Sequence, residues 1–313
     1  MKYLNLIRWK NVLIVIATMY LMRYCVIKPF LEYGDLPVML SSFNFLLMVV
    51  SVAAAAIAGY SINDYFDLKA DKINRPDEVL LGTSIPLKHA LYINYVFNAI
   101  AIAVALWFAV RLGDWNYSFV FAFTTGILWF YSTSYKSIPI LGNLIVASLV
   151  AMVPILVVAF EMILFSKTYR AELSSGTINY MPVMYFVTGF SVFAFMVTFL
   201  REMVKDMEDR EGDKEVGKKT MAVVFGIATS KIIAQVLLWA TVFSIYYVAF
   251  KYLPGDWISL AYFTIFIVIP LLYVSWKLQK ANLPNAFHLV QQILKIILVT
   301  GLLYAVLICV QLA

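Results

Sequence analysis

Long apolar runs separated by short polar segments make up most of the chain. Their approximate positions are 11–29, 42–62, 91–111, 116–131, 140–164, 182–203, 231–250, 258–276 and 293–311. About 20 apolar residues in a helix cross the hydrocarbon core of a bilayer, whereas the strands of a membrane barrel alternate between apolar and polar side chains. Because these runs are long and do not alternate, the pattern predicts an all-α polytopic membrane bundle of about nine transmembrane helices.

The composition supports this fold class and excludes several others. Of the 313 residues, 63% are hydrophobic and 13% are charged, whereas soluble domains carry about 25% charged residues. A nucleic-acid-binding module, a disulfide-rich secreted domain and a disordered chain are therefore excluded. The net charge of +6 does not indicate nucleic acid, because the basic residues of membrane proteins gather in the loops of one side.

The basic residues predict how the chain is oriented. If the N-terminus and every second loop lie on one side, that side holds 17 of the 24 Lys and Arg residues. The positive-inside rule then places the N-terminus and the segments 63–90 and 201–231 in the cytoplasm, and the C-terminus on the opposite side. We expect residues 1–313 to form a single integral-membrane domain that these two segments cap as loops.

Those two segments also hold 12 of the 18 acidic residues, in two clusters with the same spacing. Asp64, Asp67 and Asp71 stand at positions i, i+3 and i+7 after the second apolar run. Asp206, Asp209 and Asp213 repeat the spacing after the sixth. On a helix this spacing puts each trio on one face, where like charges repel and need a cation nearby.

Two explanations of the clusters are open from the residues alone. Each cluster can be a solvated helix end that lysines neutralise; those lysines are Lys69, Lys72, Lys205 and Lys214. Alternatively, two facing clusters can hold Mg²⁺, which shares its coordination shell with substrate phosphates, and so grip a diphosphate and stabilise its departure. The repeated spacing favours the second explanation and predicts two or more Mg²⁺ ions.

The clusters lie four spans apart, so both face the same side of the membrane. This placement predicts that spans 1–4 and 5–8 are two similar four-helix halves and that the ninth span is an addition. Internal duplication with a site between the halves is common in membrane proteins.

These motifs resemble those of the UbiA superfamily of intramembrane prenyltransferases. The segment from Asn63 to Asp71 matches the family pattern NDxxDxxxD, and the following Asn74-Arg75-Pro76 extends the match. Asp209 and Asp213 match the second pattern, DxxxD. The resemblance implies a helical bundle around a central cavity, a polyprenyl diphosphate donor, a lipophilic acceptor and Mg²⁺.

The resemblance also implies roles for particular residues. Metal and diphosphate contacts fall to Asn63, Asp67, Asp71, Asp209 and Asp213, and Asp64 and Asp206 support them as further metal ligands. After the fourth run, Lys136 is expected to reach the diphosphate, and either Tyr131 or Tyr135 to lie near the reacting carbon. The alternative for the tyrosines is an interfacial aromatic belt, and for Lys136 a topology charge.

Further residues are expected around the substrates. Lys72, Arg75, Lys136 and Arg201 add positive charge around the leaving group, and preorganised charge of this kind stabilises a transition state by several kcal/mol. Arg201, Lys205, Lys218 and Lys219 are candidates to hold an acceptor phosphate, although the last two can simply be topology charges. Asn11 either lines the cavity or is a polar residue at a helix start.

The segment 201–213 most resembles the geranylgeranylglycerol-phosphate geranylgeranyltransferase branch of the family, which builds ether lipids. We therefore expect geranylgeranylglycerol phosphate as acceptor, with an aromatic or quinone-precursor acceptor as the alternative. A transporter is a more remote alternative, because its site would lie near the bilayer midplane, whereas the acids here lie at loop level. A non-catalytic lipid-binding protein is the other remote alternative. No obligate protein partner is expected.

Overall fold

In the computed structural model, the described residues are 1–113 and 115–312, and most of them are helical. Eight helices are long and apolar enough to cross a membrane, and a shorter apolar helix accounts for the fourth predicted run. The described part contains no β-strand; Leu81 and Ile85 form an isolated β-bridge. The prediction of an all-α polytopic membrane bundle is confirmed, and the chain is an integral, multi-pass membrane protein.

The chain divides into two compact units. Unit 1 comprises Met1–Ala17, Ser41–Gly142 and Glu211–Thr220, and unit 2 comprises Thr18–Leu40, Asn143–Arg210 and Met221–Ala313. The short segment 211–220 is notable because it belongs to unit 1, although it follows the sixth apolar run. Unit 1 therefore contains the whole first acidic cluster and also Asp213 of the second.

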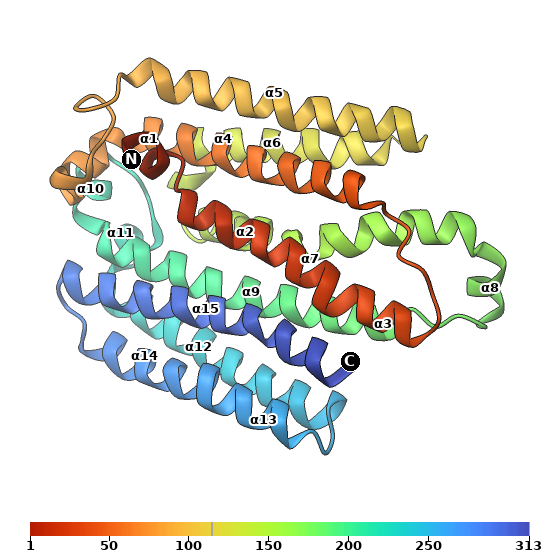
Figure 1. Ribbon diagram of the computed structural model, residues 1–313. Helices are drawn as coiled ribbons and strands as arrows, with labels where there is room; N and C mark the ends of the chain where they lie inside the picture. The colour runs from red at the N-terminus through yellow and green to blue at the C-terminus, as the bar shows by residue number, and fades with distance from the viewer. Residues whose placement is uncertain (114, 313) are drawn as a thin grey trace. The chain divides into compact units, whose positions relative to one another are not determined.

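In unit 1 three long helices lie side by side (Figure 1). They are α4 (Ser42–Asn74), α5 (Leu87–Leu112) and α6 (Asn116–Thr133). The shorter elements are α1 (Lys2–Leu6), the 3-10 helices η2 (Pro76–Glu78) and η3 (Tyr135–Ser137), most of α10 (Arg210–Glu215) and the start of α2 (Trp9–Leu21). Helix α1 packs on α4.

In unit 2 four helical segments pack so that each contacts two others. They are α9 (Met181–Glu208), α12 (Gly226–Tyr252), α14 (Ile269–Lys280) and α15 (Pro284–Leu312). The remaining elements are the π-helical turns η1 (Met22–Ile27) and η4 (Thr264–Val268), with α3 (Lys28–Tyr33), α7 (Leu141–Thr168), α8 (Arg170–Ser175), α11 (Met221–Val224) and α13 (Trp257–Phe263). The predicted repeat of two four-helix halves stays a prediction.

Helix α4 runs 12 residues beyond the apolar run that predicts it. Residues 63–74, expected at the start of a loop, are its last three turns. The helix ends at Asn74, two residues before Pro76, since proline disfavours a helical residue before it, and Arg75 takes φ −147° and ψ 62°. In the same way, residues 201–208 belong to α9 rather than to a loop.

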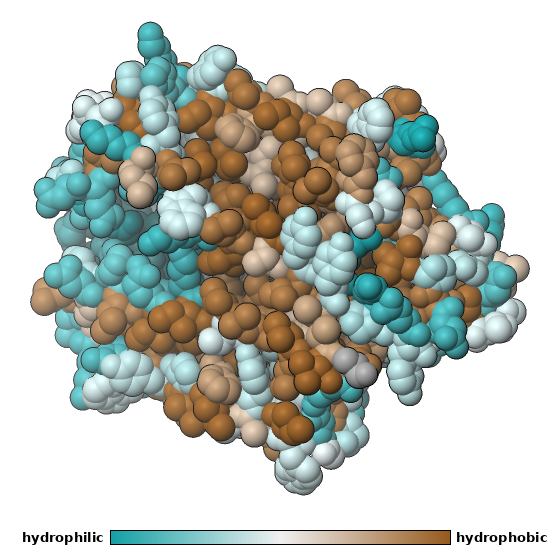
Figure 2. Space-filling model, viewed as in Figure 1, coloured by the Kyte–Doolittle hydropathy of each residue, from teal (hydrophilic) through white to brown (hydrophobic). Residues whose placement is uncertain are grey.

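Apolar side chains cover the outside of the long helices. On α5, Tyr92, Trp107 and Val110 are 69%, 48% and 75% exposed, as expected for side chains that face lipid. Figure 2 shows hydrophobic residues along the flank of α5, whereas hydrophilic residues gather at the end of unit 1 where α1 and α10 lie. α10, which carries Asp213, thus lies at a polar end of unit 1.

Candidate active site

The last turns of α4 present the first acidic cluster. Asn63 and Asp67 are buried, 7% and 4% exposed, and the Asn63 side-chain amide donates to Asp67 Oδ2 at 2.8 Å. Asp64 and Asp71 are partly exposed on the same helix. All three acids of the first trio lie on α4, although the segment is predicted to be a loop. A carboxylate as buried as Asp67 requires compensating donors or cations.

Two lysines from distant segments supply this compensation. Lys136, in η3, donates to Asp67 Oδ2 and, at 3.0 Å, to Asn63 Oδ1. Lys218 donates to Asp67 Oδ1 at 2.7 Å and lies 3.4 Å from Asp213 Oδ1. Each carboxylate oxygen of Asp67 therefore contacts a lysine ammonium group. Lys218 also contacts Asp213, so it connects the two acidic motifs.

The charge state of Lys136 follows from this environment. Burial alone would lower the pKa of its ammonium, but the attraction of Asp67, the hydrogen bond to it and the attraction of Asp71 raise the pKa above its ordinary value. Lys136 thus stays a cation at physiological pH. Because Asp71 contributes to this raised pKa, its carboxylate lies near enough to attract the Lys136 ammonium.

Helix α10 packs closely against α4 at a glycine, Gly212. The Gly212 backbone N–H donates to Asn74 Oδ1 at 2.8 Å. A Cβ atom at Gly212 would lie 2.6 Å from the Asn74 amide and 2.7 Å from the Ala70 carbonyl oxygen. Only glycine allows this approach, which brings the buried Asp213, 5% exposed, to Lys218 and the α4 motif.

Asp64 has a different partner, from the N-terminal segment. Arg8 Nη2 donates to Asp64 Oδ1 at 2.5 Å, and its guanidinium lies 5.4 Å from the centre of the Tyr60 ring. Attraction to Asp64 raises the pKa of Arg8 although burial opposes this. Arg8 has φ 52°, an uncommon conformation for a residue with a side chain. Asp64 thus anchors the segment between α1 and α2.

Unit 2 holds the other two acids of the second cluster. Asp206 accepts a hydrogen bond from the buried Asn143 side chain at 2.9 Å. Asp209 is the C-cap of α9, with φ −87° and ψ 3°. The prediction that the second trio shares one helix is wrong, because α9 ends at Glu208 and Asp213 lies on α10.

The end of α9 is fastened to α15. Glu208, 9% exposed, accepts a hydrogen bond from the Gln291 amide, and its Oε1 atom lies 3.1 Å from His288 Nδ1. On the next segment, the Arg210 Nε donates to the Ala222 carbonyl at 3.2 Å. These contacts hold the turn in which Asp209 lies.

The remaining predicted residues are more dispersed. Lys72 and Tyr135 are exposed, and Tyr135 packs near Phe130 with ring centres 6.2 Å apart. Arg75 and Tyr131 are partly buried. In unit 2, Arg201 donates to its neighbour Glu202 at 3.1 Å, and Lys205 is partly buried. Asn11 lies in the first turn of α2, where its N–H donates to the Arg8 carbonyl, as for a residue at a helix start.

Two contacts of the cluster, Lys218 with Asp67 and Arg8 with Asp64, do not follow from the sequence. From the sequence, Lys218 is a candidate for an acceptor phosphate or a topology charge, and Arg8 has no assigned role. The available signal was charge: Asp67 and Asp64 need cations, but the sequence offers many basic residues on that side. Only the fold selects Lys218 and Arg8.

The donor set suits a hard divalent cation. Across the described residues no three His, Cys, Asp or Glu side chains approach closely enough to hold a metal ion alone. Mg²⁺ is bound in proteins through one or two carboxylates and completes its shell with waters and substrate phosphates. Asp67, Asp213 and the Asn63 oxygen are ligands of that kind, and the lysines at Asp67 show that the cluster attracts cations.

Comparisons of sequence place the chain among membrane transferases. The model of the UbiA prenyltransferase family matches residues 34–307. A digeranylgeranylglyceryl phosphate synthase from Pyrococcus horikoshii is 33% identical over 77% of this chain and 74% of its own length. One from Thermococcus sibiricus is 32% identical over 84% and 83%.

Comparisons of structure agree in fold. A UbiA homologue from Aeropyrum pernix superposes with a TM-score of 0.61 at 15% identity, over 91% of this chain and 95% of that one. A UbiA homologue from Archaeoglobus fulgidus bound to DMAPP and Mg²⁺ gives 0.57 at 19% identity over 99% of both chains. The helical arrangement is therefore shared along nearly the whole length.

Proposed function

Because the chain belongs to the UbiA prenyltransferase family, we propose that its substrates are geranylgeranyl diphosphate and geranylgeranylglycerol phosphate, in ether-lipid synthesis. The prenyltransferase activity follows from the family. The choice of acceptor rests on the relatives from Pyrococcus and Thermococcus, which are named digeranylgeranylglyceryl phosphate synthases.

The observation that supports the site most strongly is Lys218 between Asp67 and Asp213. It joins the two acidic motifs within unit 1. We assign the diphosphate-binding site to this cluster, with Lys136 and Lys218 as donors to the diphosphate oxygens. Both lysines are already held within the cluster and can exchange a carboxylate contact for a phosphate contact.

We propose Mg²⁺ as the cofactor, as in the Archaeoglobus neighbour bound to DMAPP and Mg²⁺. Asn63, Asp67, Asp71 and Asp213, all in unit 1, would hold it, and Asp64 supports α4 through Arg8. Asp206 and Asp209 stay metal ligands predicted from the sequence alone. When bound, Mg²⁺ supplies positive charge to the diphosphate and stabilises it as a leaving group.

The chain's own residues then govern the transfer. The allylic C–O bond breaks with its electron pair on the diphosphate, which Lys136 and Lys218 stabilise. Tyr131, partly buried two residues before the end of α6, is the better-placed tyrosine to face the cationic carbon with its ring, because Tyr135 is exposed. The acceptor hydroxyl oxygen bonds to that carbon, and its proton passes to the departing diphosphate. Arg75 and Lys72 add positive charge at the end of α4.

The acceptor phosphate needs cations of its own. Arg201 and Lys205, both on α9, are the proposed ligands. Lys219 stays a candidate from the sequence alone. Lys218 is better assigned to the diphosphate, because its ammonium contacts Asp67 at 2.7 Å.

The test is transfer by the purified chain. Radiolabelled geranylgeranyl diphosphate and Mg²⁺ are offered with geranylgeranylglycerol phosphate or with aromatic quinone precursors. Labelled ether lipid should form with the first acceptor only, and EDTA should abolish it until Mg²⁺ is restored. Product with the aromatic acceptors alone would overturn the proposed acceptor, and EDTA-resistant transfer would overturn the metal.

A further inference from the structure

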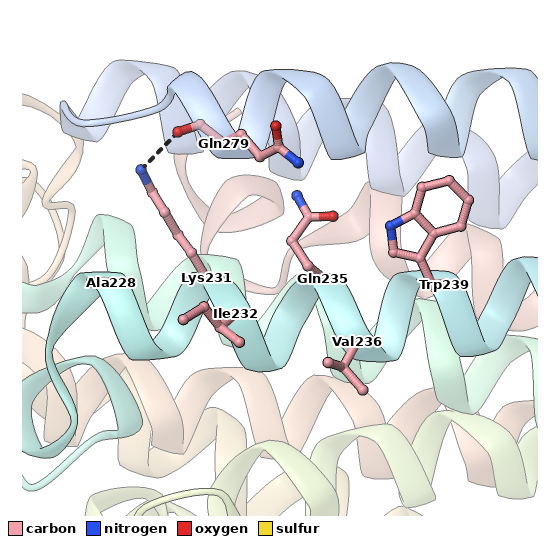
Figure 3. Close-up of a pocket in the computed structure, with 7 residues that line it drawn as sticks. All are labelled: Ala228, Lys231, Ile232, Gln235, Val236, Trp239 and Gln279. Atoms are coloured by element: carbon pink, nitrogen blue, oxygen red, sulfur yellow. Dashed lines mark hydrogen bonds between the residues drawn. The ribbon is translucent and has the colours of Figure 1, made fainter.

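An open groove lies on the outside of unit 2, between α12 and the end of α14. Its volume is about 660 Å³. The α12 residues along it recur at helical spacing, from Ala228 through Lys231 and Gln235 to Trp239, and Gln279 closes it from α14. Figure 3 shows that Lys231, Gln235 and Trp239 all point from α12 toward α14. None of these residues belongs to the proposed active site.

One end of the groove is cationic and polar. Lys231 Nζ donates to the Gln279 carbonyl at 3.2 Å, drawn as a dashed line in Figure 3, and to Asn282 Oδ1 at 3.1 Å. An ammonium group has three donors, and these acceptors use two of them. These contacts, and the Phe287 ring whose centre lies 5.8 Å from Nζ, hold the Lys231 charge at the mouth of the groove.

Apart from Gln235, the rest of the lining on α12 is apolar and exposed, and Ile232 and Val236 point away from α14 in Figure 3. One turn from Lys231, Gln235 and Ser275 bond to each other through their side chains at 2.7 Å, so the amide is satisfied within the protein. Ile232, Val236 and Trp239 are 65%, 66% and 52% exposed. Since α12 rises about 1.5 Å per residue, the stretch from Lys231 to Trp239 is about 12 Å long. This matches a charged headgroup followed by the upper part of an alkyl chain.

Two more cations lie on the neighbouring face of α14. Lys280 and Lys277 place their ammonium groups 4.3 and 5.1 Å from the centre of the Trp276 ring. Trp276 precedes Gln279 by three residues and is therefore its neighbour on the helix surface. The last turn of α14 thus carries positive charge and an aromatic ring close in sequence to Gln279, whose carbonyl Lys231 contacts.

We propose that this groove binds an anionic membrane phospholipid, with its phosphate at Lys231 and Lys280 and one chain along Ile232, Val236 and Trp239. Both flanking helices have the length and hydropathy of membrane spans, so the groove opens to lipid. Its cationic end belongs to the side predicted to be cytoplasmic, where anionic lipids attract basic residues. A zwitterionic headgroup offers less net charge to three lysines.

The test measures lipid retention by the detergent-solubilised full chain in native mass spectrometry. Phosphatidylglycerol and phosphatidylcholine of identical chains are titrated separately. Phosphatidylglycerol should bind more tightly to the wild-type chain. Lys231→Gln and Lys280→Gln should each weaken its binding about fivefold, in line with the usual effect of one basic residue at a lipid surface.

The matched control is Lys251→Gln, which removes an exposed lysine from the other end of the same helix and should leave phosphatidylglycerol binding unchanged. Lys231→Arg should retain binding because it keeps the charge. Inorganic phosphate at the lipid concentration should not compete. Equal binding of both lipids, an unaffected Lys231→Gln variant, an equal loss in Lys251→Gln or displacement by inorganic phosphate would each overturn the proposal. Should Lys231→Gln fail to fold, the exposed Lys280→Gln decides.

Discussion

At the scale of residues, Asp67 is where the contacts of the acidic cluster meet. It is 4% exposed, and it bonds to Asn63 on its own helix, to Lys136 in η3 and to Lys218 beyond α10. A buried carboxylate without cations would be costly. The two segments that supply the cations, η3 and the chain after α10, are therefore held to α4 by this one charge, and a diphosphate or a divalent cation must enter among them.

Asp67→Asn should lower kcat by about 100- to 1,000-fold, the usual loss when preorganised charge is removed from an active site. The amide keeps the size of the side chain but leaves Lys136 and Lys218 without their shared anion. Transfer from labelled geranylgeranyl diphosphate measures the effect. Asp77→Asn, an exposed acid in η2, is the control and should retain activity. Normal turnover in Asp67→Asn would remove this carboxylate from the site.

Lys136 gives a prediction about pH. Its folded pKa is raised above 10.5 by Asp67, so its stabilising contact is complete below pH 10.5 and is lost only as the pH rises through the folded value. Lys136→Met should raise the KM for the prenyl diphosphate about tenfold or more, and the ratio of mutant to wild-type KM should stay constant from about pH 6 to 9. Kinetics across that range check this. A ratio that approaches one as the pH rises toward 9 would show that Lys136 loses its proton there.

At the scale of elements, the proposed functional residues lie where a helix continues beyond its apolar run. The acidic motif extends α4 by three turns beyond the predicted span, and the proline at position 76 ends it. The second motif behaves differently, because α9 stops at Glu208 and α10 starts separately at Arg210. The break allows Gly212 and Asp213 to approach α4 within unit 1.

Gly212→Ala tests the contact between α10 and α4. Its Cβ would lie 2.7 Å from the Ala70 carbonyl oxygen, a backbone atom that cannot turn aside. We expect a loss of about 1–3 kcal/mol in stability, typical of overpacking, together with lower activity because Asp213 moves from Lys218. Thermal unfolding in detergent and the transfer assay measure the two effects. Gly126→Ala on α6, where a Cβ meets nothing within 4 Å, is the control. Equal behaviour of the two variants would contradict the close approach.

The helices are easier to predict from the sequence than the basic residues that contact the acidic side chains. The spans follow from long apolar runs. The i, i+3, i+7 spacing of Asp64, Asp67 and Asp71 fits a helix, but the loss of hydrophobicity after residue 62 hides the last three turns of α4. Lys136 was found because the family motif marks it. Lys218 and Arg8 were not connected to Asp67 and Asp64, since no local pattern tells which of many basic residues a fold brings to a carboxylate. The break after α9 was missed because spacing alone does not reveal a helix end.

At the scale of the whole molecule, the distribution of charge predicts an orientation. Both acidic motifs should face the cytoplasm, and α8 should lie on the opposite side. In a variant lacking Cys25 and Cys309, a cysteine at Asp77 should react with a membrane-impermeant maleimide only after the cells are opened. One at Arg170, on α8, should react in intact cells. The reverse pattern of labelling would contradict the predicted sidedness.

The central claim is that the two acidic motifs act on one diphosphate. Binding of geranylgeranyl diphosphate with Mg²⁺, measured by calorimetry for the wild-type chain, Asp67→Asn, Asp213→Asn and the double variant, tests it most directly. Residues that act as one unit show non-additive losses, so the double variant should bind about as weakly as the weaker single variant. Strictly additive losses, or no loss in Asp213→Asn, would show that the motifs do not share a ligand.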